Sequence, residues 1–506
     1  MFVTVYPVGG LDCSGPPIFD QWGVMSRSVA ADVAVRAKQS PDDPALLFGG
    51  ARDEVVTYAG LVAAAERIGA ELAGRYPDTR RPLALQASKS AVAIATVLAC
   101  MRAGRPLLLA STELGRELLA ELVGRSGCQA VLGVAEERLT HRPVTAAPGG
   151  PVLPEDTSLL LTTSGSTGIP KLVPLGAAGV DAFTSWAGSA FALGTGTRVL
   201  NFAPLNFDLT LLDIWGTLRH GGCVVPVDHD RSVDTKYLLG LLESTRPHVV
   251  QAVPMFFRLL TEAGTGSTFP GVRELLLTGD HVPRSVRAGL SRLFPAARLH
   301  NVYGCTETND SMIHTFSAAE AADREVLPLG SPLPGVLVDV VADGEVLRGA
   351  GSGELLVSTP FQTSGYLGEA GAKDRFVVRG DRVWYRTGDV VTRSAGGELA
   401  LVGRTDSQVK VRGVRINLEE VERVLQGHGG VAEAAVVAVP HPDSGRALHA
   451  FVRRSDDAVT GLQLRSYCAA KVNRAAIPAA FHLMTDPLPI GPTGKVSRRL
   501  LMEKIQ

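Results

Sequence analysis

The residues with the clearest potential for chemistry lie between Leu159 and Lys171, where an apolar run leads into Thr-Thr-Ser-Gly-Ser-Thr-Gly-Ile-Pro-Lys. Glycines allow several backbone N–H groups to turn toward one concavity, which suits an anion. The spacing departs from the P-loop pattern GxxxxGK[ST], because Pro170 precedes the lysine and Leu172 follows it. The segment therefore predicts a phosphate-binding loop of another type, and a flexible turn with a solvated lysine is the alternative. Its donors and turn residues are Thr163, Ser164, Gly165, Ser166, Thr167, Gly168 and Lys171.

The elements that must position this loop alternate between helix and strand from about residue 30 to residue 300. Residues 61–72 and 91–101 have the pattern of helices, and residues 83–85 and 107–109 that of short buried strands. This alternation predicts a layered α/β fold with mostly parallel strands. The Pro- and Gly-rich residues 142–156 predict a loop between two halves of this region.

The pattern changes after about residue 330. Short alternating runs, such as residues 336–341 and 354–357, predict β-hairpins with Gly-rich turns. Past Gly403 we expect a compact α+β unit of about 100 residues, in which Asn417 caps a helix and Glu420 follows three residues later. The predicted fold class is thus α/β, with a large N-terminal domain of layered α/β subdomains plus a β-rich subdomain, and a small α+β C-terminal domain.

Composition excludes several functional classes. The chain has 506 residues, with 50 Lys plus Arg against 51 Asp plus Glu, so it lacks the positive excess of a strongly basic nucleic-acid binder. Its six cysteines lie far apart without a CxxC pair, which argues against a zinc cluster or a disulfide framework and fits a reducing cytoplasm. The sequence contains no run of 18 apolar residues, so we expect no membrane span. We therefore expect a cytoplasmic protein without a nucleic-acid or membrane partner.

The string at residues 163–171, TSGSTGIPK, resembles the phosphate-binding loop of the adenylate-forming (ANL) superfamily, which includes acyl-CoA synthetases, luciferases and the adenylation domains of nonribosomal peptide synthetases. Further blocks follow in the order typical of that family, and together they span nearly the whole chain. They are NVYGCTET at residues 301–308, YRTGD at 385–389, GRTDSQVKVRGVRI at 403–416 and PTGK at 492–495. The resemblance implies that ATP activates a carboxylate as an acyl-AMP and that pyrophosphate is released.

The resemblance also assigns roles to residues and implies ATP and Mg²⁺ as cofactors. Glu307 would hold Mg²⁺, which prefers one or two carboxylates plus phosphate oxygens. Thr306 would contact the α-phosphate, and Tyr303 would stack on adenine. Asp389 would bind the ribose hydroxyls with help from Arg404, and Lys495 would reach the α-phosphate and the substrate carboxylate. The loop residues named above would hold the phosphates.

Two domains follow from the resemblance, an N-terminal adenylation core at residues 1–404 and a mobile C-terminal domain at residues 405–506, with the hinge at Asp406. In one pose Lys495 enters the site. In the other pose the region of Gly413 faces the site and a phosphopantetheine thiol is admitted. A hinge of this kind consists of a few residues that absorb a large backbone change.

The segment Asn206–Thr210 bears on the substrate. Asp208 matches the position at which amino-acid-activating members bind the substrate ammonium, and a buried ammonium needs such a partner; a turn or helix-capping Asp is the other interpretation. The polar Asp310 among apolar walls suggests a hydroxylated or diamino side chain, although pairing of Asp310 with water or a lysine is equally open. The run 207–215 is also similar to prolyl-activating members. Alignment gives the pocket residues as Asp208, Leu209, Leu212, Ala252, Leu276, Thr278, Val302, Asp310 and Ser311, closed by Lys495.

No carrier or condensation domain accompanies these motifs, so we expect a stand-alone amino acid–[carrier protein] ligase of nonribosomal peptide or antibiotic biosynthesis. It would load its amino acid onto a separate phosphopantetheinylated carrier protein. The alternatives are an acid–CoA ligase of the same superfamily, a non-catalytic nucleotide-binding relative and an amide-forming ligase.

Overall fold

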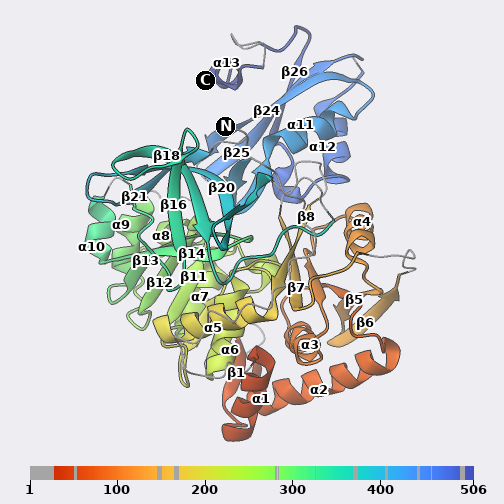
Figure 1. The fold of residues 1–506 in the computed structure, drawn as a ribbon, viewed down its shortest axis with the longest axis vertical. Coiled ribbons are helices and arrows are strands. Elements are labelled where there is room, and N and C mark those ends of the chain that lie inside the picture. The colour runs from red at the N-terminus through yellow and green to blue at the C-terminus, as the bar shows by residue number, and fades with distance from the viewer. Residues whose placement is uncertain are drawn as a thin grey trace.

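The structure is a computed structural model of the 506-residue chain. It describes residues 28–505, apart from residues 51–53, 145–150, 164–169, 280–281, 283, 325, 369–373, 405–407, 442–444, 457 and 490–495. Figure 1 shows two stacked α/β layers, a β-rich subdomain and a smaller C-terminal unit. This architecture agrees with the predicted fold class.

One layer is built on a sheet with the strand order β6-β5-β3-β4-β7-β8. Its central strands run parallel and are connected by helices, as the alternating pattern predicts. The Pro-rich residues 142–156 connect β6 to β7 within this one sheet, so the prediction that they separate two halves was wrong: turn-rich composition marks a loop but not the partner of the next strand. The elements are α2 (Tyr58–Arg75), β3 (Leu83–Gln86), α3 (Ala91–Arg102), β4 (Leu107–Ala110), α4 (Arg116–Ser126), β5 (Ala130–Ala135), β6 (Arg138–Pro143), β7 (Thr157–Thr163) and β8 (Lys171–Gly176).

The other layer is a longer sheet with the order β15-β14-β13-β12-β11-β9-β10-β1-β2. The strands from β13 to β1 in this order are parallel, and the outer pairs are antiparallel. Its strands are β1 (Pro44–Phe48), β2 (Glu54–Thr57), β9 (Arg198–Asn201), β10 (Cys223–Pro226), β11 (Val249–Ala252), β12 (Glu274–Thr278), β13 (Arg298–Cys305), β14 (Asn309–Phe316) and β15 (Ser331–Pro332). Its helices are α1 (Val29–Gln39), α5 (Ala177–Ala190), the π-helical η1 (Leu211–Gly216), α6 (Thr217–His220), η2 (His229–Arg231), α7 (Thr235–Thr245), α8 (Pro254–Ala263), α9 (Arg284–Leu293) and α10 (Ala318–Asp323).

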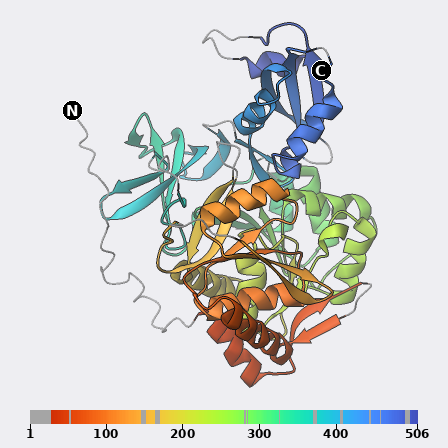
Figure 2. The same cartoon turned by 90° about the vertical axis from the view of Figure 1, so that its right-hand side faces the viewer.

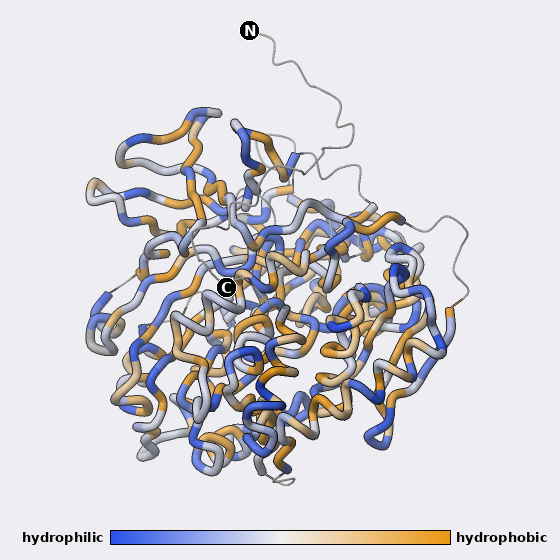
Figure 3. Tube along the Cα trace, turned by 60° about the horizontal axis from the view of Figure 1, so that its bottom comes forward, coloured by the Kyte–Doolittle hydropathy of each residue, from blue (hydrophilic) through white to orange (hydrophobic). Residues whose placement is uncertain are grey.

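The two faces of this longer sheet belong to different hydrophobic cores. Val249 and Leu276 join the large core between the layers, whereas Val250 and Leu275 join a second core with α7, α8 and α9. Successive side chains of a strand point to opposite faces, which explains this division. In Figure 3 hydrophobic and hydrophilic stretches recur side by side along the chain, as such two-sided elements require. The parity of each strand therefore decides which side chains face the other layer.

The β-rich subdomain has the order β17-β16-β18-β20-β19, and β21 pairs with β20. The runs predicted as hairpin strands at residues 336–341 and 354–357 fall in β16 and β18. The first strand begins and ends one residue later than predicted. Asp389 lies in the middle of β20, opposite Arg404 at the end of β21. The strands are β16 (Leu337–Ala342), β17 (Glu345–Val346), β18 (Gly351–Ser358), β19 (Phe376–Arg379), β20 (Arg382–Arg393) and β21 (Leu399–Arg404).

The C-terminal unit has its own core and forms the top of the molecule in Figures 1 and 2. Asn417 caps its first helix as predicted, accepting a hydrogen bond from the Glu419 backbone at 2.9 Å, whereas Glu420 is buried and burial raises its pKa to about 7. Residues 405–407 lie outside the described part, so the domain boundary and the hinge Asp406 stay predictions. The elements are β22 (Gln408–Val411), β23 (Val414–Asn417), α11 (Leu418–Gln426), β24 (Val431–His441), β25 (Gly445–Arg454), α12 (Gly461–Ala469), η4 (Arg474–Ala476), β26 (Ala480–Met484) and α13 (Arg498–Glu503).

Among the helices that the structure describes, none combines the length and apolarity needed to cross a bilayer. The described cysteines, Cys100, Cys128, Cys223, Cys305 and Cys468, form no disulfide with one another.

Candidate active site

The ends of the predicted phosphate-binding loop are held by an antiparallel strand pair. Thr163 at the end of β7 lies opposite Lys171 at the start of β8. The loop between them is therefore a hairpin connection rather than a strand-to-helix turn. Ser164, Gly165, Ser166, Thr167 and Gly168 lie outside the described residues, and their phosphate contacts stay predictions.

Glu307 lies beside these loop ends. Its Oε1 accepts a hydrogen bond from the Thr163 hydroxyl at 3.4 Å and from the Tyr366 hydroxyl at 2.7 Å, and the side chain is 2% exposed. The ammonium of Lys171 lies 4.2 Å from the centre of the Tyr366 ring. Thus the ends of the loop and the NVYGCTET block, far apart in sequence, lie around one carboxylate. Carboxylate and hydroxyl oxygens next to a lysine suit Mg²⁺ and phosphate.

Tyr366 was missed by the sequence reasoning. Burial and then the charge of Glu307 raise the pKa of its phenol far above the usual value, so it stays a hydrogen-bond donor. It also lies 3.2 Å from the hydroxyl of Tyr385, the first residue of the YRTGD block. Its proximity to Gly365 and Gly368 in the sequence was the available signal, but a single Tyr in a Gly-rich loop identifies no partner.

The predicted nucleoside residues are brought together by β13, β20 and β21. The Tyr303 hydroxyl donates to Asp389 Oδ2 at 2.6 Å, and the Arg404 guanidinium donates to Asp389 Oδ1. The backbone N–H of Asp389 is held by the Thr387 hydroxyl at 3.0 Å. A carboxylate oxygen has two lone pairs, so each oxygen of Asp389 keeps one for a ribose hydroxyl. These acceptor positions on Asp389 are compatible with a bound nucleoside.

Asp208 lies at the junction of the phosphate and substrate residues. Its half-buried carboxylate accepts a hydrogen bond from the Thr306 hydroxyl and one from the backbone N–H of Leu209. The carboxylate also interacts electrostatically with Glu307 and Lys410. Burial, followed by the Glu307 charge, raises the pKa of Asp208 above the usual value. Thr306 thus contacts Asp208 here, while its predicted contact with the α-phosphate stays a prediction. An ammonium would relieve the unfavourable burial of this carboxylate.

Three of the predicted pocket residues share the core between the layers. Leu212 from η1 joins Leu276 and Val302 in that core, and Thr278 lies opposite Val302 in the strand register. Leu209 is half-buried beside Asp208, and Ser311 is fully buried, with its hydroxyl 3.1 Å from the Asn309 carbonyl.

Ala252 does not join this group. It belongs to the second core, on the opposite face of β11 from the partners of Leu276. Gln251 lies directly opposite Leu276 and therefore shares its face. The sequence assignment was one residue out of register, and in a strand such an error moves a side chain to the other face. Gln251 takes the place that we had predicted for Ala252.

Asp310 extends the site into a buried polar cluster. Burial and the nearby charge of Asp208 raise the pKa of Asp310 to about 8. Asp213 in η1 interacts electrostatically with both Asp310 and Lys89, and its Oδ2 accepts a hydrogen bond from Asn201 at 3.0 Å. Lys89 Nζ donates to the carbonyls of Asn201 and Phe202 at 2.9 and 3.0 Å. Asp213 and Lys89 were not identified from the sequence, because their proximity depends on long-range packing.

A tight bulge places Asp310. The pairing of β13 with β14 shifts register between Tyr303 and Gly304. A Cβ atom on Gly304 would lie 2.3 Å from the Asn309 carbonyl oxygen and 2.7 Å from Asp310 Cα, so only glycine permits this approach. Asn309 adopts a positive φ of 56°, and its side chain accepts a hydrogen bond from the Asp310 backbone at 2.8 Å. The bulge therefore fixes the backbone position of Asp310, a predicted pocket residue.

The hairpin of β22 and β23 faces this site. Gly413 lies so close to Val253 that an added Cβ atom would be 2.7 Å from Val253 Cγ1, and Lys410 acts electrostatically on Asp208. The two predicted poses of the C-terminal domain stay predictions. Lys495 lies outside the described residues, and its catalytic role stays a prediction.

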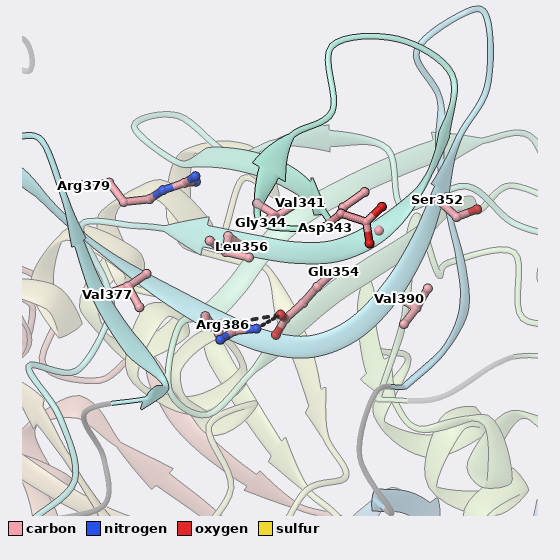
Figure 4. A pocket seen from close by; sticks show the side chains of 12 residues that line it. Val341, Asp343, Gly344, Ser352, Glu354, Leu356, Val377, Arg379, Arg386 and Val390 are labelled. Atoms are coloured by element: carbon pink, nitrogen blue, oxygen red, sulfur yellow. Dashed lines mark hydrogen bonds and ion pairs between the residues drawn. The ribbon is translucent and has the colours of Figure 1, made fainter. Parts of the chain in front are cut away.

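A separate hollow of 620 Å³ lies on the β-rich subdomain, and Figure 4 shows the side chains that line it. Three of its charged side chains pair with neighbours: Arg386 donates to Glu354 at 3.1 Å, and Arg379 to Asp339 at 3.2 Å. Val390 lines the hollow, so the adjacent Asp389 points to the opposite face of β20. The hollow is therefore separate from the nucleoside residues.

Comparison with known proteins agrees with this geometry. Residues 33–367 match the AMP-binding enzyme family, and residues 420–495 match the AMP-binding enzyme C-terminal domain. The chain is 28% identical over 498 residues to a D-alanine–D-alanyl carrier protein ligase of Bacillus cereus (strain B4264), covering 93% of this chain and 98% of that protein.

Two solved structures have the same fold. The adenylation domain AlmE of Vibrio cholerae, in complex with glycyl-adenosine-5'-phosphate, aligns with a TM-score of 0.81 and 20% identity over 100% of both chains. Holo-PA1221, an NRPS protein containing adenylation and PCP domains, aligns with a TM-score of 0.79 and 25% identity over 95% of this chain and 84% of that chain. The family match alone spans more than half of the sequence, and the protein belongs to the AMP-binding enzyme family.

Proposed function

We propose that this protein activates an amino acid with ATP, releases pyrophosphate and transfers the aminoacyl group to the phosphopantetheine thiol of a separate carrier protein. One observation carries the proposal. Asp208, which is suited to an ammonium, lies close enough to Glu307 for their charges to interact. An amino acid whose ammonium meets Asp208 thus has its carboxylate beside the residues proposed to hold the phosphates.

The chain's own residues supply binding and orientation for this reaction. A carboxylate oxygen of the amino acid attacks the α-phosphorus of ATP, the bond to the β-phosphate oxygen breaks, and pyrophosphate leaves. We propose that the loop at residues 163–168, Lys171 and Lys495 neutralise the phosphates, and that Glu307 holds Mg²⁺. The cation would stabilise charge on the phosphate oxygens. Fixed positive groups of this kind stabilise the negative charge that develops on the phosphate oxygens in the transition state.

The nucleoside would be held by three residues. Asp389 would accept hydrogen bonds from the ribose hydroxyls, with Arg404 fixing its carboxylate, and the Tyr303 ring would stack on adenine. The observed hydrogen bonds from Tyr303 and Arg404 to Asp389 support this arrangement, because they orient the carboxylate before the nucleotide arrives. Thr306 is proposed to bridge Asp208 and the α-phosphate.

The second half-reaction requires access for a thiol. The Gly413 hairpin, packed on Val253, supports a pose in which the C-terminal domain presents β22 and β23 to the site. We propose that residues 405–506 rotate about Asp406 between this pose and one in which Lys495 enters. The relatives named as a carrier protein ligase and as an adenylation and PCP protein support a carrier protein as acceptor. A cytoplasmic location and a role in nonribosomal peptide or antibiotic biosynthesis belong to the proposal.

Amino-acid-dependent exchange of labelled pyrophosphate into ATP tests the first step. Transfer to a phosphopantetheinylated carrier protein, compared with transfer to free coenzyme A, tests the second. We expect exchange with an amino acid, its loss in Asp208→Ala, and normal exchange in Asp343→Asn, an exposed substitution in the β-rich subdomain. Exchange driven only by acids without nitrogen would refute the amino-acid assignment, and efficient transfer to coenzyme A alone would refute the carrier.

A further inference from the structure

The floor of the candidate substrate site contains more polar groups than the fold itself uses. We call Asn201, Asp213, Gln251 and Asp310 the polar floor; the first three are 0% exposed and Asp310 is 7% exposed. Both amide atoms of Gln251, Oδ1 of Asn201 and Oδ1 of Asp213 have no hydrogen-bond partner within the part of the chain that the structure describes. Leaving a buried polar group unsatisfied costs about 1–3 kcal/mol. Such groups are expected to have a partner that the protein itself does not supply.

The polar floor lies where a substrate side chain would extend. Gln251 is directly opposite Leu276 on β12 and opposite Asn201 on β9, so all three point to the same face of the sheet. Leu276 belongs to the core that also contains Leu212 and Val302. Asp310 lies close enough to Asp208 for their charges to interact. The floor therefore borders the residue proposed to bind the substrate ammonium.

The charges of the floor are not balanced internally. Asp213 has a positive neighbour in Lys89, and Asp208 would be neutralised by the substrate ammonium. Asp310, by contrast, interacts with Asp208 and Asp213, which are both acidic. Asp310 thus has no positive neighbour within the described chain, and a positive group from outside it would favour the ionised form of this carboxyl group.

The hydrogen-bonding groups of the floor also favour a positively charged partner. Carboxylate and amide oxygens predominate, and the Gln251 Nε2 is the one unsatisfied donor among the described atoms of the floor. An ammonium has three donors and no acceptor, so it matches a group of side chains in which oxygens predominate. An apolar side chain such as a methyl group would leave these oxygens unsatisfied.

We propose, building on the amino-acid-activating function above, that the substrate is a short diamino acid. Asp208 binds the ammonium next to the carboxylate being activated. Asp310 and the Gln251 amide oxygen bind a second ammonium on the side chain, and Asn201 and Asp213 complete the floor. Because the charges of Asp208 and Asp310 interact, we take the two nitrogens to be separated by two or three carbons, as in 2,3-diaminopropionate and 2,4-diaminobutyrate.

Matched substrates test the class of side chain. In pyrophosphate exchange, 2,4-diaminobutyrate is compared with norvaline, which has a methyl group in place of the second ammonium, and with homoserine, which has a hydroxyl. 2,3-Diaminopropionate is compared with 2-aminobutyrate and serine, and both enantiomers of each compound are used. We expect kcat/KM for one of the diamino acids to exceed that of its apolar match by about 100-fold or more, because an unpaired buried group penalises the analogue.

Two variants assign the preference to the floor. Asp310→Asn keeps the shape and removes the charge, and Gln251→Met removes the amide. We expect each to lower the diamino-to-apolar kcat/KM ratio, by about 100-fold and about 10-fold respectively, because a charged partner contributes more than a neutral one. Asp343→Asn, an exposed aspartate, is the matched control and should leave the ratio unchanged. Calorimetric binding of the diamino acid to the full chain without ATP should weaken in the same order.

The possible outcomes distinguish a failure of the diamino-acid inference from a failure of the proposed amino-acid-activating function. Norvaline or alanine turned over as well as the diamino acids would overturn this inference and leave amino-acid activation standing. A preference for homoserine or serine would overturn it in favour of a hydroxylated substrate. An unchanged ratio in Asp310→Asn, with a cooperative thermal melt showing that the variant is folded, would also overturn it. Exchange with no amino acid in the panel would overturn the proposed function as well.

Discussion

The most informative single change is Asp310→Asn, examined as a function of pH without substrate. The pKa of Asp310 is about 8 in the folded protein because of burial and the neighbouring Asp208. In an unfolded chain the pKa of an aspartate is about 3.9. Between these values the folded protein holds a proton that the unfolded chain releases. The contribution of Asp310 to stability is therefore greatest below pH 4 and is lost as pH rises toward 8.

The size of this effect follows from the same two values. One pH unit corresponds to about 1.36 kcal/mol, so keeping Asp310 protonated costs roughly 1.5 kcal/mol at pH 5 and roughly 4 kcal/mol at pH 7. Asparagine does not titrate and fills the same space. The variant should gain about 2.7 kcal/mol over the parent protein between pH 5 and pH 7. Scaled to a unit of about 400 residues, this corresponds to roughly 3–5 °C in melting temperature.

The assay is a series of thermal melts at pH 5, 6, 7 and 8 for the parent protein, Asp310→Asn and the exposed control Asp343→Asn. Asp208, Asp213 and Lys89 titrate in both the parent and the variant, so their contributions largely cancel in the difference. We expect the advantage of Asp310→Asn to grow with pH and the control to show none. A difference that stays constant from pH 5 to pH 8 would refute the claim that Asp310 is held neutral beside Asp208.

Three further predictions follow from the same contacts. Asp208→Asn should lower kcat/KM for the amino acid by about 30-fold or more, at least about 2 kcal/mol, with little change in KM for ATP; unchanged amino-acid kinetics would contradict the ammonium contact. Tyr366→Phe removes the 2.7 Å hydrogen bond to Glu307 and should lower kcat by about 10-fold while raising the Mg²⁺ concentration needed; a Mg²⁺ titration that does not shift would contradict this. Lys89→Met breaks two hydrogen bonds to carbonyls and leaves Asp213 without its positive neighbour, so melting should show a loss of about 2–4 kcal/mol, and an unchanged melt would contradict it.

Several residues of the candidate active site could be assigned from the sequence because their motifs resemble those of the adenylate-forming superfamily. The loop ends Thr163 and Lys171 and the distant Glu307 were assigned to one phosphate site, and the structure places the three together around Tyr366. The grouping of Tyr303, Asp389 and Arg404 is likewise found in the structure. Each of these residues lies in a compact motif whose residue types serve one kind of chemistry. Tyr366 lies outside such a motif and was not identified.

Residue order alone was less reliable for features that depend on strand pairing. The Pro-rich residues 142–156 looked like a boundary, yet β6 and β7 belong to the same sheet. Ala252 was assigned to the substrate site, although the register of β11 gives that face to Gln251. A shift of one residue changes nothing in the composition of the segment and reverses the direction of every side chain.

The sequence by itself determined the division into helices and strands, the order of the domains and the chemical groups available for handling phosphate and ammonium, because periodicity and short motifs are local properties. Only the tertiary structure decided which of these groups are neighbours. The bulge at Gly304, the packing of η1 on β9 and the register of β11 bring Asp310, Asp213 and Gln251 to the same region beside Asp208. Burial and mutual repulsion of charges arise only from that proximity, and they are the basis for the proposed substrate class.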